Sequence, residues 1–132
     1  NKNCDIIVIE TRKGNRYMGY YTHYSLEVRD IKNVQEHAVL REMIDKFDCF
    51  QQDEFALYES EAYFYPEDEV KWYDHENDMI NLSKFFPDMT FCLEGVGEDR
   101  EDMWRKYFHN GIVDYCHAHI SYPAPTKVNW DD

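Results

Sequence analysis

Apolar and polar residues alternate with a period of two along four segments of the chain. In the first, from Tyr20 to Val28, the even-numbered residues face one way, and the odd-numbered residues from Tyr21 to Arg29 face the other. The same alternation returns in the segments 89–93, 103–108 and 112–122. A period of two is typical of a strand with one buried face, so we predict strands in all four segments.

Further strands are predicted where β-branched and aromatic residues cluster. They are Asp5–Glu10, Phe55–Tyr65 with an interruption or bulge near residues 59–61, and Val70–Tyr73. The dipeptide Asn110-Gly111 lies between the last two alternating segments. Asn-Gly tolerates the positive φ angles of a type I′ turn, whose twist matches that of paired strands, so we predict a C-terminal β-hairpin.

Two other segments place apolar residues at the spacing of an amphipathic helix. Asn33 is predicted to cap the first helix, and Glu36, three residues later, completes a capping box. The buried stripe of this helix is expected to comprise Ala38, Leu40, Met43, Ile44 and Phe47. A second helix, capped by Asp74 and ended by Pro87, has its apolar positions at Met79, Ile80, Leu82, Phe85 and Phe86.

From residue 18 onward, the predicted order is strand, helix, one or two strands, helix, strand and hairpin. This order favours an α+β fold with two helices packed on one face of a mostly antiparallel sheet, with a ferredoxin-like split β-α-β as the leading candidate. A length of 132 residues fits a single domain. Residues 1–17 are then an extra strand or an appended segment, and residues 123–132 an extended tail that can dock back on the domain.

The charge of the chain narrows the choice of partners. The formal net charge is −13, from 14 basic and 27 acidic residues, and residues 1–17 carry +2, which leaves −15 for the rest. Such a surface repels nucleic acid and anionic membranes, and it favours either a basic protein partner or simple solubility. We therefore expect no direct binding of nucleic acid, and the apolar runs are too short to span a membrane.

Two acidic runs and the tyrosines are candidates for binding a partner protein. The first run is Glu67, Asp68 and Glu69, and the second, around Arg100, is Glu98, Asp99, Glu101 and Asp102. If it binds no partner, the second run is expected to be a solvated loop. Tyr21 and Tyr63 are the candidate aromatic contacts, because tyrosine is enriched in interface hot spots. A homodimer that covers the open face of the sheet would use the same aromatic surface.

Catalytic and metal-binding patterns are not recognisable in the sequence. His117 and His119 share one face of a predicted strand, but no third zinc ligand is recognisable by spacing. Residues 98–102 are expected in a loop that follows Gly95-Val96-Gly97, and their net charge of −3 opposes the binding of phosphate there. We expect neither an enzyme nor a bound cofactor or metal. The alternative is a small-molecule or nucleotide-binding domain with a cleft between the sheet and its helices.

The redox state expected of the cysteines indicates the cellular compartment of the protein. Cys4, Cys49, Cys92 and Cys116 form no C-x-x-C pair, and a chain of this size does not need a disulfide in order to fold. We expect buried free thiols, which indicates a reducing compartment.

Several motifs resemble a family of small phage and prophage proteins of unassigned function. They are Met18-Gly19-Tyr20-Tyr21, the stretch 71–76, Phe86-Pro87-Asp88 and the hairpin sequence 107–111. The resemblance covers residues 18–122, leaves out residues 1–17, and extends more distantly to YubB-type ferredoxin-like domains. It carries over no catalytic residue. Together with the acidic charge, it implies a non-enzymatic protein, in the cytoplasm of a host cell, that inhibits a host factor with a basic surface. The most specific form of this implied function is an anti-defence, anti-CRISPR-like mimicry of nucleic acid.

Overall fold

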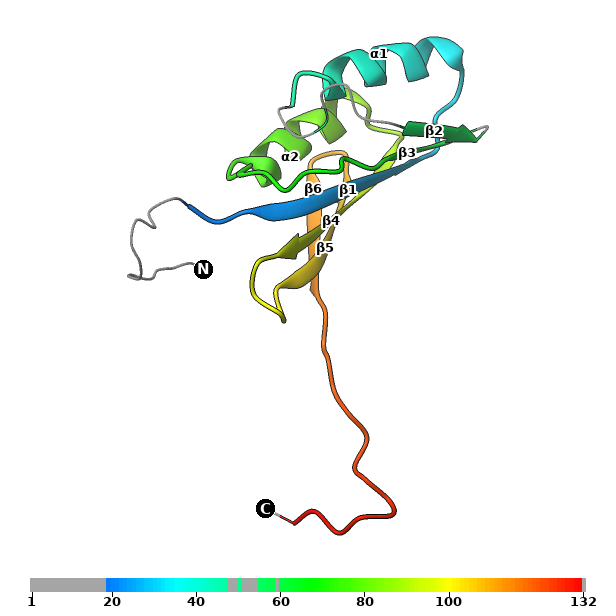
Figure 1. Cartoon of the computed structure of the whole chain (residues 1–132). Helices are drawn as coiled ribbons and strands as arrows, with labels where there is room; N and C mark the ends of the chain where they lie inside the picture. The colour runs from blue at the N-terminus through cyan, green and yellow to red at the C-terminus, as the bar shows by residue number, and fades with distance from the viewer. Residues whose placement is uncertain (1–18, 48–49, 51–54, 59, 132) are drawn as a thin grey trace.

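The computed structural model describes residues 19–47, 50, 55–58 and 60–131. Eight elements follow one another along this part of the chain, and Figure 1 labels them. In order, they are β1 (Thr22–Arg29), α1 (Val34–Ile44), β2 (Phe55–Tyr58), β3 (Glu61–Phe64), α2 (His75–Phe85), β4 (Thr90–Gly97), β5 (Met103–His109) and β6 (Ile112–His117).

The six strands form one sheet in the order β2-β3-β1-β4-β5-β6, and all five neighbouring pairs are antiparallel. Strand β1 lies at the centre, where Leu26 pairs with Phe64 of β3 on one side and with Leu93 of β4 on the other. Both helices lie on the same side of the sheet (Figure 1). The predicted α+β fold, with two helices on one face of an antiparallel sheet, is therefore confirmed.

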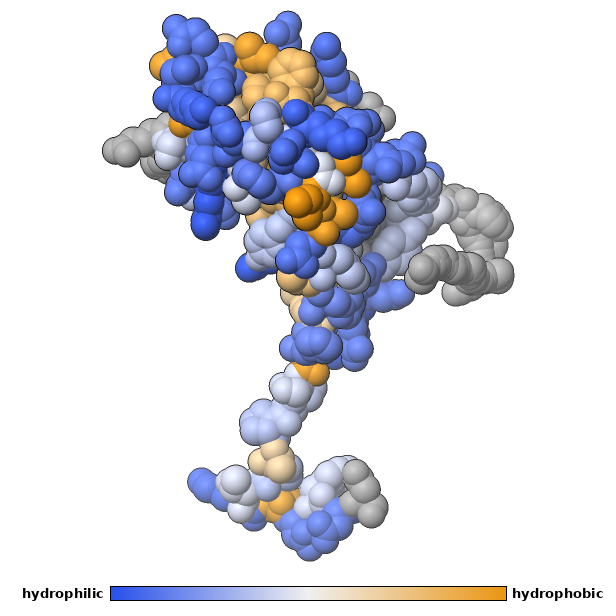
Figure 2. Space-filling model, turned by 180° about the vertical axis from the view of Figure 1, so that it is seen from behind, coloured by the Kyte–Doolittle hydropathy of each residue, from blue (hydrophilic) through white to orange (hydrophobic). Residues whose placement is uncertain are grey.

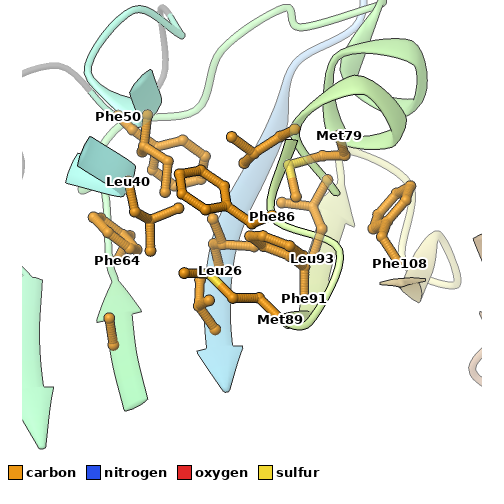
Figure 3. Close-up of a cluster of buried hydrophobic side chains, with 14 of the residues drawn as sticks. Leu26, Leu40, Phe50, Phe64, Met79, Phe86, Met89, Phe91, Leu93 and Phe108 are labelled. Atoms are coloured by element: carbon orange, nitrogen blue, oxygen red, sulfur yellow. The ribbon is translucent and has the colours of Figure 1, made fainter. Parts of the chain in front are cut away.

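The core fills the space between this face of the sheet and the helices (Figure 3). Alternate residues of the central strands are buried, and Leu26, Phe91 and Leu93 among them are at most 1% exposed. From the helices, the side chains in contact with them are Leu40, Ile44, Met79 and Leu82. The alternation predicted for residues 20–28 is thus confirmed, because residues 22, 24, 26 and 28 are buried and residues 23, 25 and 27 are only partly covered.

Two local signals act as the sequence predicts. Asn33 Oδ1 accepts a hydrogen bond from the backbone N–H of Glu36 at 2.8 Å, and the Glu36 carboxylate accepts one from the N–H of Lys32 at 3.0 Å. Asn110 and Gly111 have φ angles of +45° and +85°, as a type I′ turn requires. The hairpin of β5 and β6 is confirmed, and Ser83 of α2 ties it to the helix layer by accepting a hydrogen bond from the N–H of Gly111 at 2.9 Å.

The segment between the helices differs from its prediction. Residues 55–65 form a hairpin of two strands, β2 and β3, rather than one interrupted strand. Residues 70–73 are not a strand, since only Val70 pairs, through two hydrogen bonds of 2.9 and 3.0 Å with Thr22. Trp72 instead packs its ring against Tyr24 in the core, with the ring centroids 5.2 Å apart. Burying this large ring ends the extended pairing, because the chain must turn toward the helix layer.

Both helices bury a narrower stripe than predicted. Ala38 is exposed, and the Phe85 side chain is 60% exposed. Phe86 takes the buried position at the end of α2, at 7% exposure. Each helix has only 11 residues, about three turns, so only a few side chains reach the sheet. Asp74 precedes α2 but makes no side-chain capping bond.

The C-terminal tail runs away from the sheet as a single extended arm (Figure 1). Residues 119–131 are exposed throughout, and Trp130 is 75% exposed. The sequence predicts a strand to residue 122 and an extended tail from residue 123, but β6 ends at His117 and the extended arm begins before Pro123. Over residues 119–131 the tail does not dock back on the sheet. The predicted strand Asp5–Glu10, with the rest of residues 1–17, lies outside the described residues. Among the described helices, none is both long and apolar enough to cross a membrane.

Candidate functional site

The fold brings the two acidic runs to the same end of the sheet. Thr22, the first residue of β1, pairs with Gly97 at the end of β4 on one side and with Val70 on the other. The first acidic run directly precedes Val70, and the second directly follows Gly97. We call this region the acidic end, and it comprises Glu67, Asp68, Glu69, Glu98, Asp99, Glu101 and Asp102.

The β4–β5 loop is fixed against the residues that precede β1. The Tyr20 hydroxyl donates to Asp102 Oδ2 at 2.6 Å and accepts from the backbone N–H of Asp99 at 3.0 Å. The backbone N–H of Tyr21 donates to Glu98 Oε2 at 2.7 Å. Burial and the hydrogen bond to Asp102 raise the pKa of Tyr20 above its ordinary value. Glu98 and Asp102 therefore bind the chain before β1 through their carboxylates, although Glu98 remains exposed as expected of a solvated loop.

Gly95 and Gly97 both belong to β4, and the strand β5 rather than a helix follows the second acidic run, so these glycines do not precede a helix N-terminus. A Cβ at Gly97 would collide with the Asp102 carboxylate and the Tyr20 hydroxyl. This glycine therefore allows the close approach of the Tyr20–Asp102 pair. The remaining carboxylates of the acidic end, those of Glu67, Asp68, Glu69, Asp99 and Glu101, belong to exposed residues.

The two candidate tyrosines do not form one site. Tyr21 belongs to the acidic end, where Lys71 Nζ lies 5.2 Å from the centroid of its ring. Tyr63 pairs with Glu27 of β1. Glu27 is five residues beyond Thr22, so Tyr63 lies about 17 Å along the strand from the acidic end, at 3.4 Å per residue. Its ring stacks on that of Tyr65 at 6.0 Å, and its hydroxyl donates to Glu61 at 2.6 Å. This hydrogen bond raises the pKa of Tyr63 to about 12.

Tyr63 lines a shallow hollow of about 380 Å³ on the open face of the sheet, opposite the helices. Two arginines, Arg29 and Arg105, also line it, but each donates to a carboxylate beside it: Arg29 to Glu27 at 2.7 Å and Arg105 to Glu94 at 3.0 Å. The hollow is not a cleft between the sheet and its helices, which the small-molecule alternative expected. Each guanidinium already faces a carboxylate, whose negative charge weakens its attraction for an incoming anion.

The two described cysteines are free, as predicted, but they are not both buried. Cys92 is half-buried in the hollow, where burial raises the pKa of its thiol. Cys116 is exposed on β6. Cys4 and Cys49 lie outside the described residues. Since a raised thiol pKa disfavours the thiolate, Cys92 is a poor nucleophile.

A buried polar cluster beneath α2 was not recognised as a unit from the sequence. His75 Nδ1 donates to the carbonyl oxygen of Trp72 at 2.9 Å, so its Nε2 can accept from Lys106 Nζ, also at 2.9 Å. Lys106 makes an ion pair with Glu76 at 2.9 Å and lies 4.9 Å from the centroid of the Trp104 ring. The available signal was the position of Lys106 between Trp104 and Phe108 on the buried face of a strand. The cluster satisfies a nearly buried charge, and none of its groups points to a substrate.

This cluster predicts a pH dependence of stability. Burial, followed by the charge of Lys106, lowers the pKa of His75 below its ordinary value of 6.5. The unfolded chain therefore binds a proton more readily than the native state, so the free energy of unfolding should fall as the pH drops through 6.5. Urea unfolding between about pH 7.5 and about pH 5 should show this loss. In a His75→Gln variant, which stays neutral, the loss should be smaller, and equal losses in both proteins would contradict the assignment. The pKa of His37 is also lowered, so some pH dependence should remain.

The histidine pair on β6 does not extend to a larger cluster. The rings of His117 and His119 lie 6.2 Å apart between centroids, and both residues are exposed. Over the described part of the chain, no three His, Cys, Asp or Glu side chains are grouped as a metal site requires.

The site therefore rests on geometry alone, and the resemblance to small phage proteins stays a prediction. Comparisons of the chain with protein-family models, with curated proteins and with solved structures find no match.

Proposed function

We propose that this chain is a non-enzymatic binding protein whose acidic end occupies a basic surface of a partner protein. The proposal rests on one observation. The two acidic runs are separated by 28 residues in the sequence, residues 70–97, yet they lie on either side of the first residue of β1. A sheet end that concentrates seven carboxylates presents a negative field to any partner that approaches it.

The arrangement of cations supports this role. The ion pairs found among the described residues involve Arg29, Lys32, Arg41, Arg105 and Lys106, and none of them uses a carboxylate of the acidic end. The cations nearest in sequence to the acidic runs are Lys71 and Arg100. Over the described part of the chain, these ion pairs therefore leave the carboxylates of the acidic end to interact with a partner. Since the β4–β5 loop is held by Tyr20 and Tyr21, its charges are also presented in a defined arrangement.

The partner we propose is a host factor whose basic channel normally binds nucleic acid. An acidic protein that fills such a channel inhibits by mimicry, which is the anti-defence, anti-CRISPR-like role implied by the resemblance to phage proteins. This role would place the chain in the cytoplasm of the host cell. The proposal rests on charge and resemblance, and the same fold can serve other functions.

The strand order supports a finer classification of the fold, which we also propose. The sequence β2-β3-β1-β4 within the sheet, with a helix between β1 and β2 and another between β3 and β4, has the connectivity of a ferredoxin-like split β-α-β. The hairpin of β5 and β6 would then be an addition at the β4 edge.

A second candidate function is binding of a small molecule in the hollow of the open sheet face. The stacked Tyr63 and Tyr65 rings and the two nearby arginines favour it. The ion pairs that already engage both arginines count against it, so we place it second.

The test compares two double variants with the same change of charge. Glu67→Lys with Glu101→Lys alters one exposed carboxylate in each acidic run, and Glu42→Lys with Asp131→Lys alters two exposed carboxylates elsewhere; both raise the net charge from −13 to −9. Both pairs leave Glu98 and Asp102 in place, so the loop keeps its bonds to Tyr20 and Tyr21. With the partner recovered from the host, the first variant should slow association by about tenfold at low salt, and the second much less.

The wild-type complex should also weaken steeply with salt, and duplex nucleic acid should compete with it. The proposal would be contradicted if the affinity of the complex did not change with salt and the variants of the acidic end did not slow its association. If Tyr21→Ala and Tyr63→Ala then each raised the dissociation rate enough to lose about 2 kcal/mol of binding free energy, as expected of interface hot spots, the aromatic surface would be the site instead.

A further inference from the structure

Strand β6 leaves one edge of the sheet without a partner strand among the described residues. It pairs only with β5, and in a two-residue hairpin the residues next to the turn, His109 and Ile112, form a hydrogen-bonded pair. The alternation then directs the backbone groups of Asp114 and Cys116 toward β5, consistent with the bond from Ala118 N–H to the Met103 carbonyl at 2.9 Å. The N–H and C=O groups of Val113, Tyr115 and His117 therefore face outward.

Among the described residues, this edge has little of the usual protection against pairing, since Asp114 is the only Asp, Glu, Lys or Arg residue in β6. Natural edge strands are shielded by lysines, prolines, bulges or an element that covers them. β6, with the sequence IVDYCH, contains no lysine or proline, and its pairing with β5 is regular from Ile112 to His117. Ile112 on one face is 69% exposed and Tyr115 on the other is 55% exposed, whereas Val113 is partly buried against the core. Edges of this kind pair with another strand.

The exposed apolar surface continues from β6 into the tail. Ile120, Tyr122, Val128 and Trp130 are 52–82% exposed. Figure 2 shows the tail as an arm that leaves the body of the molecule, with apolar residues exposed along it. Residues 120–131 of the tail are extended and exposed, so their apolar side chains are available to lie along another molecule.

We infer that β6 pairs with β6 of a second copy of this chain, antiparallel about a two-fold axis, so that two sheets become one. In this arrangement Tyr115 lies opposite Tyr115 of the second copy, and Asp114 lies opposite Cys116. The inference concerns a different surface from the acidic end and does not depend on the proposed function.

Charge excludes one competing register and is compatible with a second copy as the occupant. Asp114 is the only Asp, Glu, Lys or Arg residue in β6, and the two-fold register centred on Asp114 would place the two Asp114 carboxylates opposite each other, which destabilises a strand pair. The register centred on Tyr115 avoids this repulsion. An antiparallel pair also keeps the two acidic ends at opposite ends of the shared sheet. Each acidic end then lies on the same side as the hairpin turn of the other copy, next to which Lys84 is placed.

The same geometry gives the tail a place to bind. In this register Ala118 lies opposite Ile112 of the second copy, so the tail passes the Asn110-Gly111 turn of that copy. The C-terminal end of α2 lies beside this turn, because Ser83 bonds to Gly111 at 2.9 Å. Phe85, whose side chain is 60% exposed, is two residues further on. Ile120 and Tyr122 of the tail would therefore reach an aromatic side chain that the single chain leaves uncovered.

The test uses opposite charges at the two-fold axis. Tyr115→Glu and Tyr115→Lys each place like charges opposite one another in the dimer, and should each weaken dimerisation by about tenfold or more. An equimolar mixture of the two variants places Glu opposite Lys and should restore the dimer. Light scattering coupled to size exclusion should give twice the chain mass of 16.0 kDa for wild type and for the mixture, and a lower mass for either variant alone.

Amide exchange on the wild-type full chain gives a second readout that needs no variant. The outward amides of Val113, Tyr115 and His117 should be protected as protein concentration rises, while those of Asp114 and Cys116, which bond to β5, should be protected at all concentrations. A monomer at high micromolar concentration with fast exchange at the three outward amides would overturn the inference. So would a dimer whose mass is unchanged by either charge variant.

Discussion

A Gly95→Val variant is expected to lose about 3 kcal/mol of unfolding free energy, since overpacking a filled core costs roughly 1–3 kcal/mol and here the obstacle is a ring held in place. Gly95 lies on the buried face of β4, directly opposite Trp104 of β5. A Cβ at this position would overlap the six-membered ring of Trp104. That ring cannot move away easily, because it stacks on His75 at 5.1 Å and lies under Lys106.

Urea unfolding at neutral pH measures this loss. Val96→Ile adds one methylene on the next residue of the same strand, where the side chain faces the open side of the sheet, and should change stability by less than about 0.5 kcal/mol. A Gly95→Val, Trp104→Leu double variant should lose less than the sum of its single variants, because removing the ring makes room for the valine. A Gly95→Val protein as stable as wild type would show that the ring does not lie over this strand as described.

Phe91→Ala is expected to cost about 4 kcal/mol, within the range of 3–5 kcal/mol for truncating a buried phenylalanine. Phe91 is fully buried at the centre of the sheet, where it pairs with Val28 on one side and with Phe108 on the other. Figure 3 shows its ring among Met89, Leu93 and Phe86. Strands on both sides fix the backbone at this position, so the cavity can close only partly. Since a domain has only about 5–15 kcal/mol of stability, the variant should lie close to its unfolding threshold.

Phe85→Ala is the matched control, with the same change of side chain at a residue that is 60% exposed. It should cost less than about 1 kcal/mol when measured at a protein concentration low enough to keep the chain monomeric. The midpoint and slope of urea unfolding should therefore separate the two variants clearly. Equal losses would mean that the helix layer covers Phe85, contrary to the structure, or that Phe91 is not part of the core.

The sequence by itself determined the features that depend on neighbouring residues. The capping of α1 by Asn33 and Glu36 and the type I′ turn at Asn110-Gly111 were predictable, because each is set by hydrogen bonds or φ angles within a few residues. The buried faces of β1, β4 and β5 were predictable as well, since alternate residues of a strand necessarily point to opposite faces. These features, with the order of helices and strands, were sufficient to predict the α+β class.

The same reasoning failed where a distant contact outweighed a local pattern. The aromatic stretch 55–65 had the composition of one long strand, and its division into β2 and β3 depends on β3 pairing with β1. Residues 70–73 have the sequence pattern of a strand, but Trp72 packs against Tyr24, which is more than forty residues away in the sequence. Composition alone cannot rank such contacts, because their energy depends on which side chains meet across the core.

The candidate site shows the same division. The sequence identified both acidic runs, but only the pairing of Thr22 with Val70 and Gly97 placed them at one end of the sheet. It did not separate Glu98 and Asp102, which bind the chain at Tyr20 and Tyr21, from the exposed carboxylates around them. Nor could it show that Tyr63 lies away from Tyr21, or that the tail and β6 are uncovered. Charge and alternation are local properties of the chain, whereas proximity and exposure follow from the strand order, which long-range pairing decides.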